Sequence, residues 1–334
     1  MDSVTGSDRV RVRELPLHVR FMAGESTGSY VTRLAGRNGL EVQQLLDEVG
    51  QGSTRAVAPQ LTELYLNRPA AERLAALAGR PLEVMRRALA SLDAAYLLDD
   101  GDGTPAWSFP WAVRDGYLVR ACALCAARRG IGEPAWMMVA DPWHLCARHA
   151  RWSDNSRDPQ TPWIDVADWP RILAAERQRV AMERPLGRTA RALFADARTM
   201  SRTESSAPDR LRSMADRLGE ARAASLLSYP HSVRIARVLA QAERRRLGRE
   251  LTADSYEDWF TRSSQELGPR YREVLRRWME CHKPVPGPGS KRGDGLRRAV
   301  LVAPHTRIAP LDSVQQLSCL PSGPVASPFD RPFL

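Results

Sequence analysis

The chain has 334 residues, enough for two domains or several small ones, and an apolar fraction of 43% that is sufficient for a buried core. Its formal net charge of +10 is almost wholly arginine, because Lys283 and Lys291 are the only lysines. This charge favours nucleic acid as a partner, although a membrane surface, an acidic protein or the codon usage of a GC-rich genome would also account for it. No stretch approaches the ~18 apolar residues that cross a bilayer and the start lacks an apolar signal core, so we expect neither a membrane protein nor a secreted one.

The first helical pattern follows an extended segment at Pro16-Leu17. We expect this helix to stop at Asn38-Gly39 and to begin at an N-cap oxygen from Ser26, Thr27 or Ser29. A second short helix should end at Gly50, because apolar residues recur before it at helical spacing, namely Val42, Leu45, Leu46 and Val49.

Residues 69–98 predict another pair of helices joined by a tight turn. Gly79 ends the first of them and Pro81 suits the first position of the second. The apolar spacing continues the second helix through Leu82, Met85, Leu89 and Leu92. Such a pair is compatible with a DNA-binding helix-turn-helix and also with a plain corner of an all-helical fold, and both interpretations stay open.

The composition changes between residues 99 and 169, where helical periodicity is lost. Seven of the nine tryptophans and three of the five cysteines lie in this stretch. This pattern is typical of a small module with little regular structure, in which a metal ion and a few large rings replace an extensive core.

Helical periodicity returns between residues 170 and 282. The apolar stripes there are Leu211, Met214 and Leu218, then Ile235, Val238, Leu239 and Ala242, then Tyr256, Trp259, Phe260 and Leu267, then Tyr271, Val274, Leu275 and Trp278. The basic run Arg244-Arg245-Arg246 lies on the same helix as the second stripe, and a solvated helix face is its simpler interpretation. From Lys283 onward Pro and Gly recur, so we expect a mobile tail.

One motif carries most of the chemical information: Cys122-x2-Cys125, twenty residues, then Cys146-x2-His149. Each pair presents two ligands from a tight turn, and the two pairs complete the tetrahedral shell that Zn²⁺ adopts in structural sites. Four protein ligands leave no position for water, so one structural Zn²⁺ is predicted. The alternative, three small buried cysteines beside a surface histidine, requires two regular pairs to arise by chance. His144 is the remaining candidate ligand, and its position two residues before Cys146 suits the shell poorly.

The remaining chemistry argues against an enzyme. The sequence has no HExxH, no GK[ST] loop and no His-x-Glu ahead of the first cysteine pair. Glu133 and Asp141 lie between the cysteine pairs and are more simply solvated carboxylates than an acid–base pair. The odd number of cysteines indicates a reducing cytoplasm rather than a disulfide framework. We therefore predict no catalytic residue and no small-molecule substrate, and we assign no role to Cys281 and Cys319.

These features predict a mainly α fold in four parts. They are an N-terminal helix-turn-helix-like region at 1–98, a small irregular zinc module at 99–169, a C-terminal helical domain at 170–282 and a Pro/Gly-rich tail at 283–334.

Three blocks in order resemble the TniQ family over residues 16–152. The first is LPLHVRFMAGESTGSYVTRLAGRNGL, which matches at Gly24-Glu25-Ser26 and Arg33-Leu34-Ala35. The second is LYLNRPAAERLAALAGRPLEVMRRAL, and the third is the metal segment with Arg120, Trp136 and the two ligand pairs. Two features depart from the family pattern, because Ala123 and Ala147 stand where proline is typical and no second finger follows His149.

The resemblance implies an accessory protein of bacterial transposons that choose their targets. Such a protein bridges target DNA, or a guide complex bound to it, to a AAA+ ATPase that recruits the transposase. Whether a guide RNA complex is involved and whether the chain forms a homodimer are left open. As candidate DNA contacts we name the arginines of the second helix pair and those around the metal, which are Arg80, Arg86, Arg87, Arg128, Arg129, Arg148 and Arg151.

Two other functions fit the same residues. One is a stand-alone transcriptional regulator whose helix-turn-helix reads an operator and needs no ATPase. The other is a protein-interaction scaffold that docks its partner through tryptophan-rich surfaces, with its charge serving solubility alone.

Overall fold

The structure is a computed structural model that describes residues 13–110, 116–156, 158–186, 188–202, 216–247 and 253–281. The chain divides into two compact units, unit 1 ending at Ile164 and unit 2 starting at Asp165. The tail expected at 283–334 lies outside the described residues.

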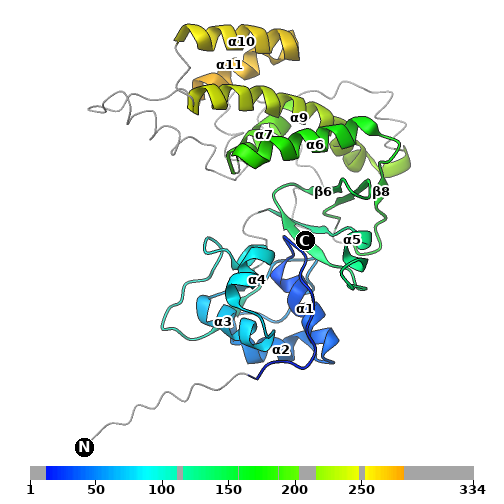
Figure 1. Ribbon diagram of the computed structural model, residues 1–334, viewed down its shortest axis with the longest axis vertical. Helices are drawn as coiled ribbons and strands as arrows, with labels where there is room; N and C mark the ends of the chain where they lie inside the picture. The colour runs from blue at the N-terminus through cyan, green and yellow to red at the C-terminus, as the bar shows by residue number, and fades with distance from the viewer. Residues whose placement is uncertain are drawn as a thin grey trace, which may run out of the picture. The chain divides into compact units, whose positions relative to one another are not determined.

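Unit 1 begins with a helical part (Figure 1). Its helices are α1 (Thr27–Arg37), α2 (Val42–Val49), α3 (Arg68–Leu77) and α4 (Leu82–Ala88), followed by the 3₁₀ turn η1 (Ala90–Leu92). A small sheet accompanies them, in which β3 (Ala106–Ser108) pairs parallel with β1 (Gln51–Gly52) and antiparallel with β2 (Tyr65–Leu66).

The helix ends of this part follow the capping chemistry of the sequence. The Ser26 hydroxyl accepts a hydrogen bond from the Ser29 backbone N–H at 3.2 Å, and Asn38 caps the other end of α1. Asn67 caps α3 in the same way by accepting from the Ala70 N–H at 3.0 Å. The predicted bounds of α1 and α2 are confirmed.

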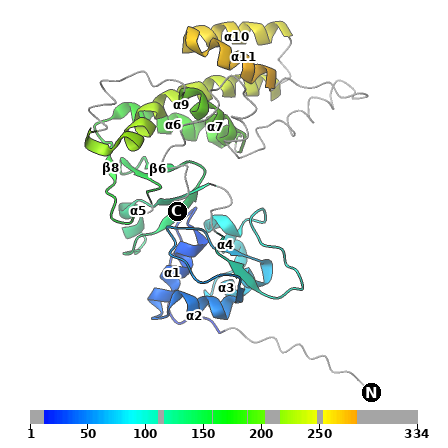
Figure 2. The same cartoon turned by 180° about the vertical axis from the view of Figure 1, so that it is seen from behind.

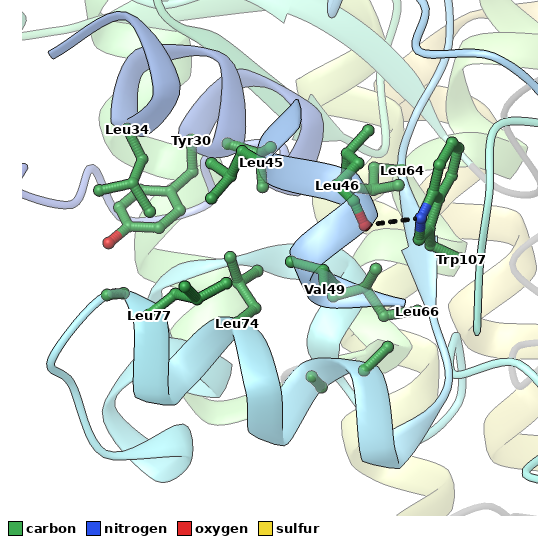
Figure 3. Packing of buried hydrophobic residues seen from close by; sticks show 14 of the residues in the cluster. Tyr30, Leu34, Leu45, Leu46, Val49, Leu64, Leu66, Leu74, Leu77 and Trp107 are labelled. Carbon is green, nitrogen blue, oxygen red and sulfur yellow. Dashed lines mark hydrogen bonds between the residues drawn. The ribbon is translucent and has the colours of Figure 1, made fainter. Parts of the chain in front are cut away.

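The apolar faces of α1, α2 and α3 meet in one core, which Figure 3 shows from close by. Trp107 of β3 closes one side of this core, and its indole N–H donates to the backbone oxygens of Leu46 at 3.0 Å and Gly50 at 2.9 Å. Complete burial of such side chains stabilises the fold by about 1.5–3 kcal/mol each. The core side chains labelled in Figure 3 are Tyr30, Leu34, Leu45, Leu46, Val49, Leu64, Leu66, Leu74, Leu77 and Trp107.

Helix α4 ends earlier than its apolar spacing predicts. The backbone is extended at Leu89, and Leu92 lies in η1 instead of continuing the helix. The cause is pairing with the segment at Glu25, because the Gly24 N–H donates to the Ala88 oxygen at 2.8 Å and the Ala90 N–H to the Glu25 oxygen at 3.2 Å. Leu89 and Leu92 are buried all the same.

The second part of unit 1 is a module of short strands. The strands β4 (Tyr117–Arg120) and β5 (Trp136–Val139) pair antiparallel, with the short helix α5 (Ala123–Ala127) between them. A three-stranded sheet of order β6-β7-β8 follows, formed by β6 (Trp143–Cys146), β7 (Arg151–Asp154) and β8 (Ile164–Asp165). The expectation of an irregular module is thus only partly right, since strands of two to four residues are too short to show an alternating pattern.

Backbone hydrogen bonds join the two parts of unit 1. The Ser26 N–H donates to the Trp136 oxygen at 2.9 Å, and the Met138 N–H donates to the Gly24 oxygen at 3.0 Å. Residues 24–26 therefore pair with β5 on one side and with the end of α4 on the other. The helical part and the strand module consequently fold as one unit.

Unit 2 starts at Asp165, the last residue of β8, and its remaining described elements are helices. It contains α6 (Pro170–Leu186), α7 (Arg188–Arg202), α9 (Glu220–Leu247), α10 (Ala253–Leu267), the 3₁₀ turn η2 (Pro269–Tyr271) and α11 (Arg272–Cys281). Helices α6 and α7 pack on α9, and α10 packs on α11, as Figure 1 and Figure 2 show from opposite sides. The predicted apolar stripes from Ile235 onward are buried where their side chains are described, whereas Leu211 and Met214 of the first stripe lie outside the described residues. The Trp278 indole N–H donates to Asp196 of α7 at 2.9 Å.

Among the described residues no helix is long and apolar enough to cross a membrane.

Candidate metal centre

Two tight turns of the strand module present the four predicted ligands. Cys122 follows β4 as the N-cap of α5, and Cys125 lies within that short helix. Cys146 is the last residue of β6, and the His149 N–H donates to the Cys146 oxygen at 3.2 Å to close the second turn. The next residue, Ala150, has a φ of 49°, which lets the chain reverse into β7 at a cost of roughly 1 kcal/mol or more.

The two turns face each other because β4 packs against β6 and β7. The His149 Nδ1 lies 3.4 Å from the Cys122 Sγ, 3.3 Å from the Cys125 Sγ and 3.5 Å from the Cys146 Sγ. The Sγ atoms of Cys125 and Cys146 are 3.6 Å apart, and all four ligand atoms lie within 4.8 Å of one another.

These distances suit a tetrahedral metal ion. In a tetrahedron, Zn–S bonds of about 2.3 Å and Zn–N bonds of about 2.0 Å place a sulfur and a nitrogen roughly 3.5 Å apart and two sulfurs roughly 3.8 Å apart. The contacts between the thiols and the imidazole, and that between the thiols of Cys125 and Cys146, lie close to these values. The cluster can therefore hold a metal ion, and the geometry assigns Nδ1 as the ligand nitrogen of the histidine. His144, on β6, is not part of the cluster.

The Cys146 thiol and the His149 imidazole are both held in their neutral forms. Burial, together with the thiols of Cys125 and Cys122, raises the pKa of the Cys146 thiol to about 12. Burial and the charges of Arg148, Arg128 and Arg151 lower the pKa of His149, which keeps its imidazole neutral and able to bind a metal. A bound divalent ion would instead lower the pKa of the thiols, because it stabilises the thiolate form.

A small apolar cluster lies behind the ligands. Met22 from the N-terminal segment packs with side chains that flank the first cysteine pair, and Cys125 and Met137 pack against the cluster. These side chains back the first cysteine pair with apolar packing. The other buried members are Ala121, Ala126, Ile131 and Ala135.

Arg120 holds the loop that follows β7. Its guanidinium donates to the backbone oxygens of Pro159 and Thr161 and lies 3.5 Å from the centroid of the Trp163 ring. The Ser153 hydroxyl donates to the Arg120 oxygen at 2.6 Å. Arg120 thus stabilises the module that carries the ligands, and it is not an exposed charge.

The predicted arginine contacts fall into two groups. Arg128, Arg148 and Arg151 act together on His149, and the guanidinium of Arg151 lies 5.6 Å from the Trp163 ring centroid. Arg129 is exposed and donates to the Phe21 oxygen at 2.8 Å.

The second group lies at the turn between α3 and α4. Arg80 and Arg87 are exposed, whereas Arg86 is half-buried and pairs with Glu83 of the same helix at 3.3 Å.

Sequence reasoning missed the role of Glu25 and Arg33. The Arg33 Nε and Nη2 donate to the two carboxylate oxygens of Glu25, each at 2.8 Å, and both side chains are buried. The Ser29 hydroxyl and the Met22 N–H donate to the same carboxylate, and Arg33 also donates to the Arg20 oxygen. This network fixes the segment that joins α1 to β5. A glutamate and an arginine eight residues apart do not indicate, from the sequence alone, that both side chains are buried.

In a comparison with protein families, residues 16–151 match the TniQ family model. The match covers the helical part and both ligand pairs. Comparisons with curated proteins and with solved structures found no match.

Proposed function

We propose that this chain is a member of the TniQ family, because residues 16–151 match the model of that family, and that it is a non-enzymatic adaptor that links target DNA to a AAA+ ATPase and thereby to the transposase. The family is a non-catalytic accessory family of transposition. The family match carries the proposal, because the matched residues contain the Cys/His cluster and the arginines beside it.

We propose Zn²⁺ as the ion of the cluster and a structural role for it. Three thiolates and one imidazole nitrogen form a donor set typical of zinc, and they leave no position for a substrate or a reactive water. Cys122, Cys125, Cys146 and His149 would hold the ion, and the ion would cross-link the turns after β4 and β6. Its contribution is the folding energy of a module whose strands are too short to be stable alone.

The proposed DNA contact is the arginine group around His149. Arg128 and Arg148 are exposed and Arg151 is half-buried on β7, so their charges gather on the outside of the metal turns. Guanidinium groups bind phosphate oxygens in a bidentate manner, and a rigid metal-held turn fixes where they point. Arg80 and Arg87, beside α4, would add contacts if that helix approaches the duplex.

The DNA contact is tested by salt dependence. The triple variant Arg128→Ala, Arg148→Ala, Arg151→Ala should weaken binding to a DNA duplex and reduce the slope of log K against log salt by about 0.9 per lost contact. The matched control is Arg37→Ala, Arg55→Ala, Arg68→Ala, which removes three exposed arginines from the same unit. If both triples change the slope equally, the contact is not at the metal turns, and binding that is indifferent to salt would contradict DNA binding through phosphates.

The partner is tested by reconstitution. Purified chain should co-elute with the AAA+ ATPase encoded beside a transposase, and the complex should form on DNA without a fixed operator. A footprint on one operator in the absence of ATPase would instead support a stand-alone regulator. No DNA binding even at low salt would support the protein-interaction scaffold.

A further inference from the structure

A hollow of about 320 Å³ lies between α6 and α9 in unit 2. Its α6 wall contains Gln178, Ala181 and Met182, and its α9 wall contains Arg237, Gln241 and Arg244. The lining therefore combines an apolar floor, two amides and two guanidinium groups.

The described carboxylates of these two helices are not paired with the arginines of the hollow. On α6, Glu176 and Glu183 both bind Arg179, with the Arg179 Nη2 at 2.9 Å from the Glu176 Oε1. The hydroxyl of Tyr229 donates to Glu176 from α9. On α9, Glu243 is buried. The acidic side chains described on α6 and α9 are thus engaged in the packing between the helices.

The two arginines of the hollow are accessible to a charged ligand. Arg237 and Arg244 are exposed, and the Arg237 Nη1 donates to the uncharged Gln178 Oε1 at 3.2 Å. Neither has a carboxylate partner among the residues that the structure describes. They are seven residues apart on one helix, so they repeat after two turns, about 10 Å along α9.

We propose that the α6–α9 hollow docks an acidic amphipathic helix of a protein partner. Carboxylates placed about two turns apart on the incoming helix would meet the guanidinium groups of Arg237 and Arg244, and its small apolar side chains would cover Ala181 and Met182. The proposal does not depend on the role in transposition.

The lining favours a protein over a nucleic acid. Single-stranded nucleic acid is bound by aromatic platforms that stack on the bases, and the described residues that line the hollow include no aromatic ring. A duplex is read by an element that protrudes into its groove, whereas this site is concave. Charge complementarity and the apolar floor therefore indicate a helix with one acidic and one apolar stripe.

The experiment measures binding of a fluorescein-labelled peptide to the full chain by anisotropy. The probe is a helical peptide of about 15 residues with two glutamates seven positions apart beside an alanine–leucine stripe, and its partner peptide carries glutamines instead. The wild type should bind the glutamate peptide about tenfold or more tightly than the glutamine peptide. Arg237→Glu, Arg244→Glu should abolish this preference, and Arg237→Gln, Arg244→Gln repeats the test without reversing charge.

The matched control is Arg177→Glu, Arg184→Glu. These two arginines are also exposed and seven residues apart, but on α6 outside the lining of the hollow. The preference should survive this change within about twofold. Equal affinity for both peptides, or equal losses in both reversal variants, would overturn the proposal. A single-stranded oligonucleotide that outcompetes the peptide and depends on Arg237 and Arg244 would assign the hollow to nucleic acid instead.

Discussion

Two buried glutamates of unit 1 have opposite surroundings. Glu25 receives the full guanidinium fork of Arg33 together with two further donors, whereas Glu63 receives neutral donors only, from the Gly28 and Leu64 N–H groups and the Ser91 hydroxyl. Both side chains are fully enclosed. The charge of Glu25 is compensated within the fold, and that of Glu63 is not.

Removing the guanidinium should therefore leave Glu25 as an uncompensated buried charge. Arg33→Ala should lower the free energy of unfolding of unit 1 by about 3–5 kcal/mol, measured by urea denaturation. The control is Arg68→Ala, which removes an exposed ion pair with Glu72 and should cost less than about 1 kcal/mol. Similar losses in the two variants would show that the buried network does not stabilise the fold.

The second glutamate predicts a pH dependence of stability. Burial raises the pKa of Glu63 from 4.5 to about 7, so the folded chain holds this proton more tightly than the unfolded chain. The associated stability is fully present below pH 4.5 and is lost as the pH rises to 7, by about 3 kcal/mol. Glu63→Gln should remove this loss.

The measurement for Glu63 is the difference in unfolding free energy between wild type and variant at each pH. Both proteins carry the same metal ligands, so the proton linkage of the cluster cancels in the difference. The unfolding free energy of the variant, relative to that of the wild type, should increase steadily between pH 4.5 and 7 and should stay constant above pH 7. A difference that is independent of pH would contradict the raised pKa.

Loss of one ligand should empty the metal centre. Cys122→Ser should reduce bound zinc from about one ion per chain to nearly none, because a three-ligand site with a hydroxyl binds far more weakly. Elemental analysis of the purified protein measures the ion, and limited proteolysis reports the loosened module. His144→Ala, which removes a histidine of the same module outside the cluster, should retain the ion. Zinc-free wild-type protein would contradict the assignment.

At the scale of elements, the turn between α3 and α4 depends on one left-handed residue. Gly79 has a φ of 58°, and a Cβ there would lie 2.0 Å from the Glu14 Oε1. Gly79→Ala should lower the melting temperature, at a cost of about 1 kcal/mol, because L-residues are strained in this region. Gly36 lies inside α1 with open space around it, so Gly36→Ala should raise the melting temperature. If both changes stabilise the protein, the left-handed turn is not required.

The same elements show how far the sequence predicts this structure. Helices α1 and α2 follow from capping residues and apolar spacing, which are local properties. The early end of α4 does not, because Leu89 has good helical spacing and leaves the helix to pair with Glu25, more than sixty residues away. The four metal ligands are predictable because their chemistry and pairwise spacing are local. Arg120 and Arg33 resemble exposed charges in sequence, and only the fold brings them to buried partners.

At the scale of the whole chain, the metal should stabilise one unit and not the other. The ligands, the apolar cluster behind them and the segment around Glu25 all belong to unit 1, whereas unit 2 packs its helices around α9 with tryptophans of its own. Calorimetry of the full chain should therefore show two transitions, since separate cores unfold separately. A chelator should lower the temperature of one transition by several degrees and leave the other unchanged, because binding energy lost from one native core does not reach a core that unfolds independently. A single transition that shifts as a whole would show instead that the two units unfold as one cooperative body.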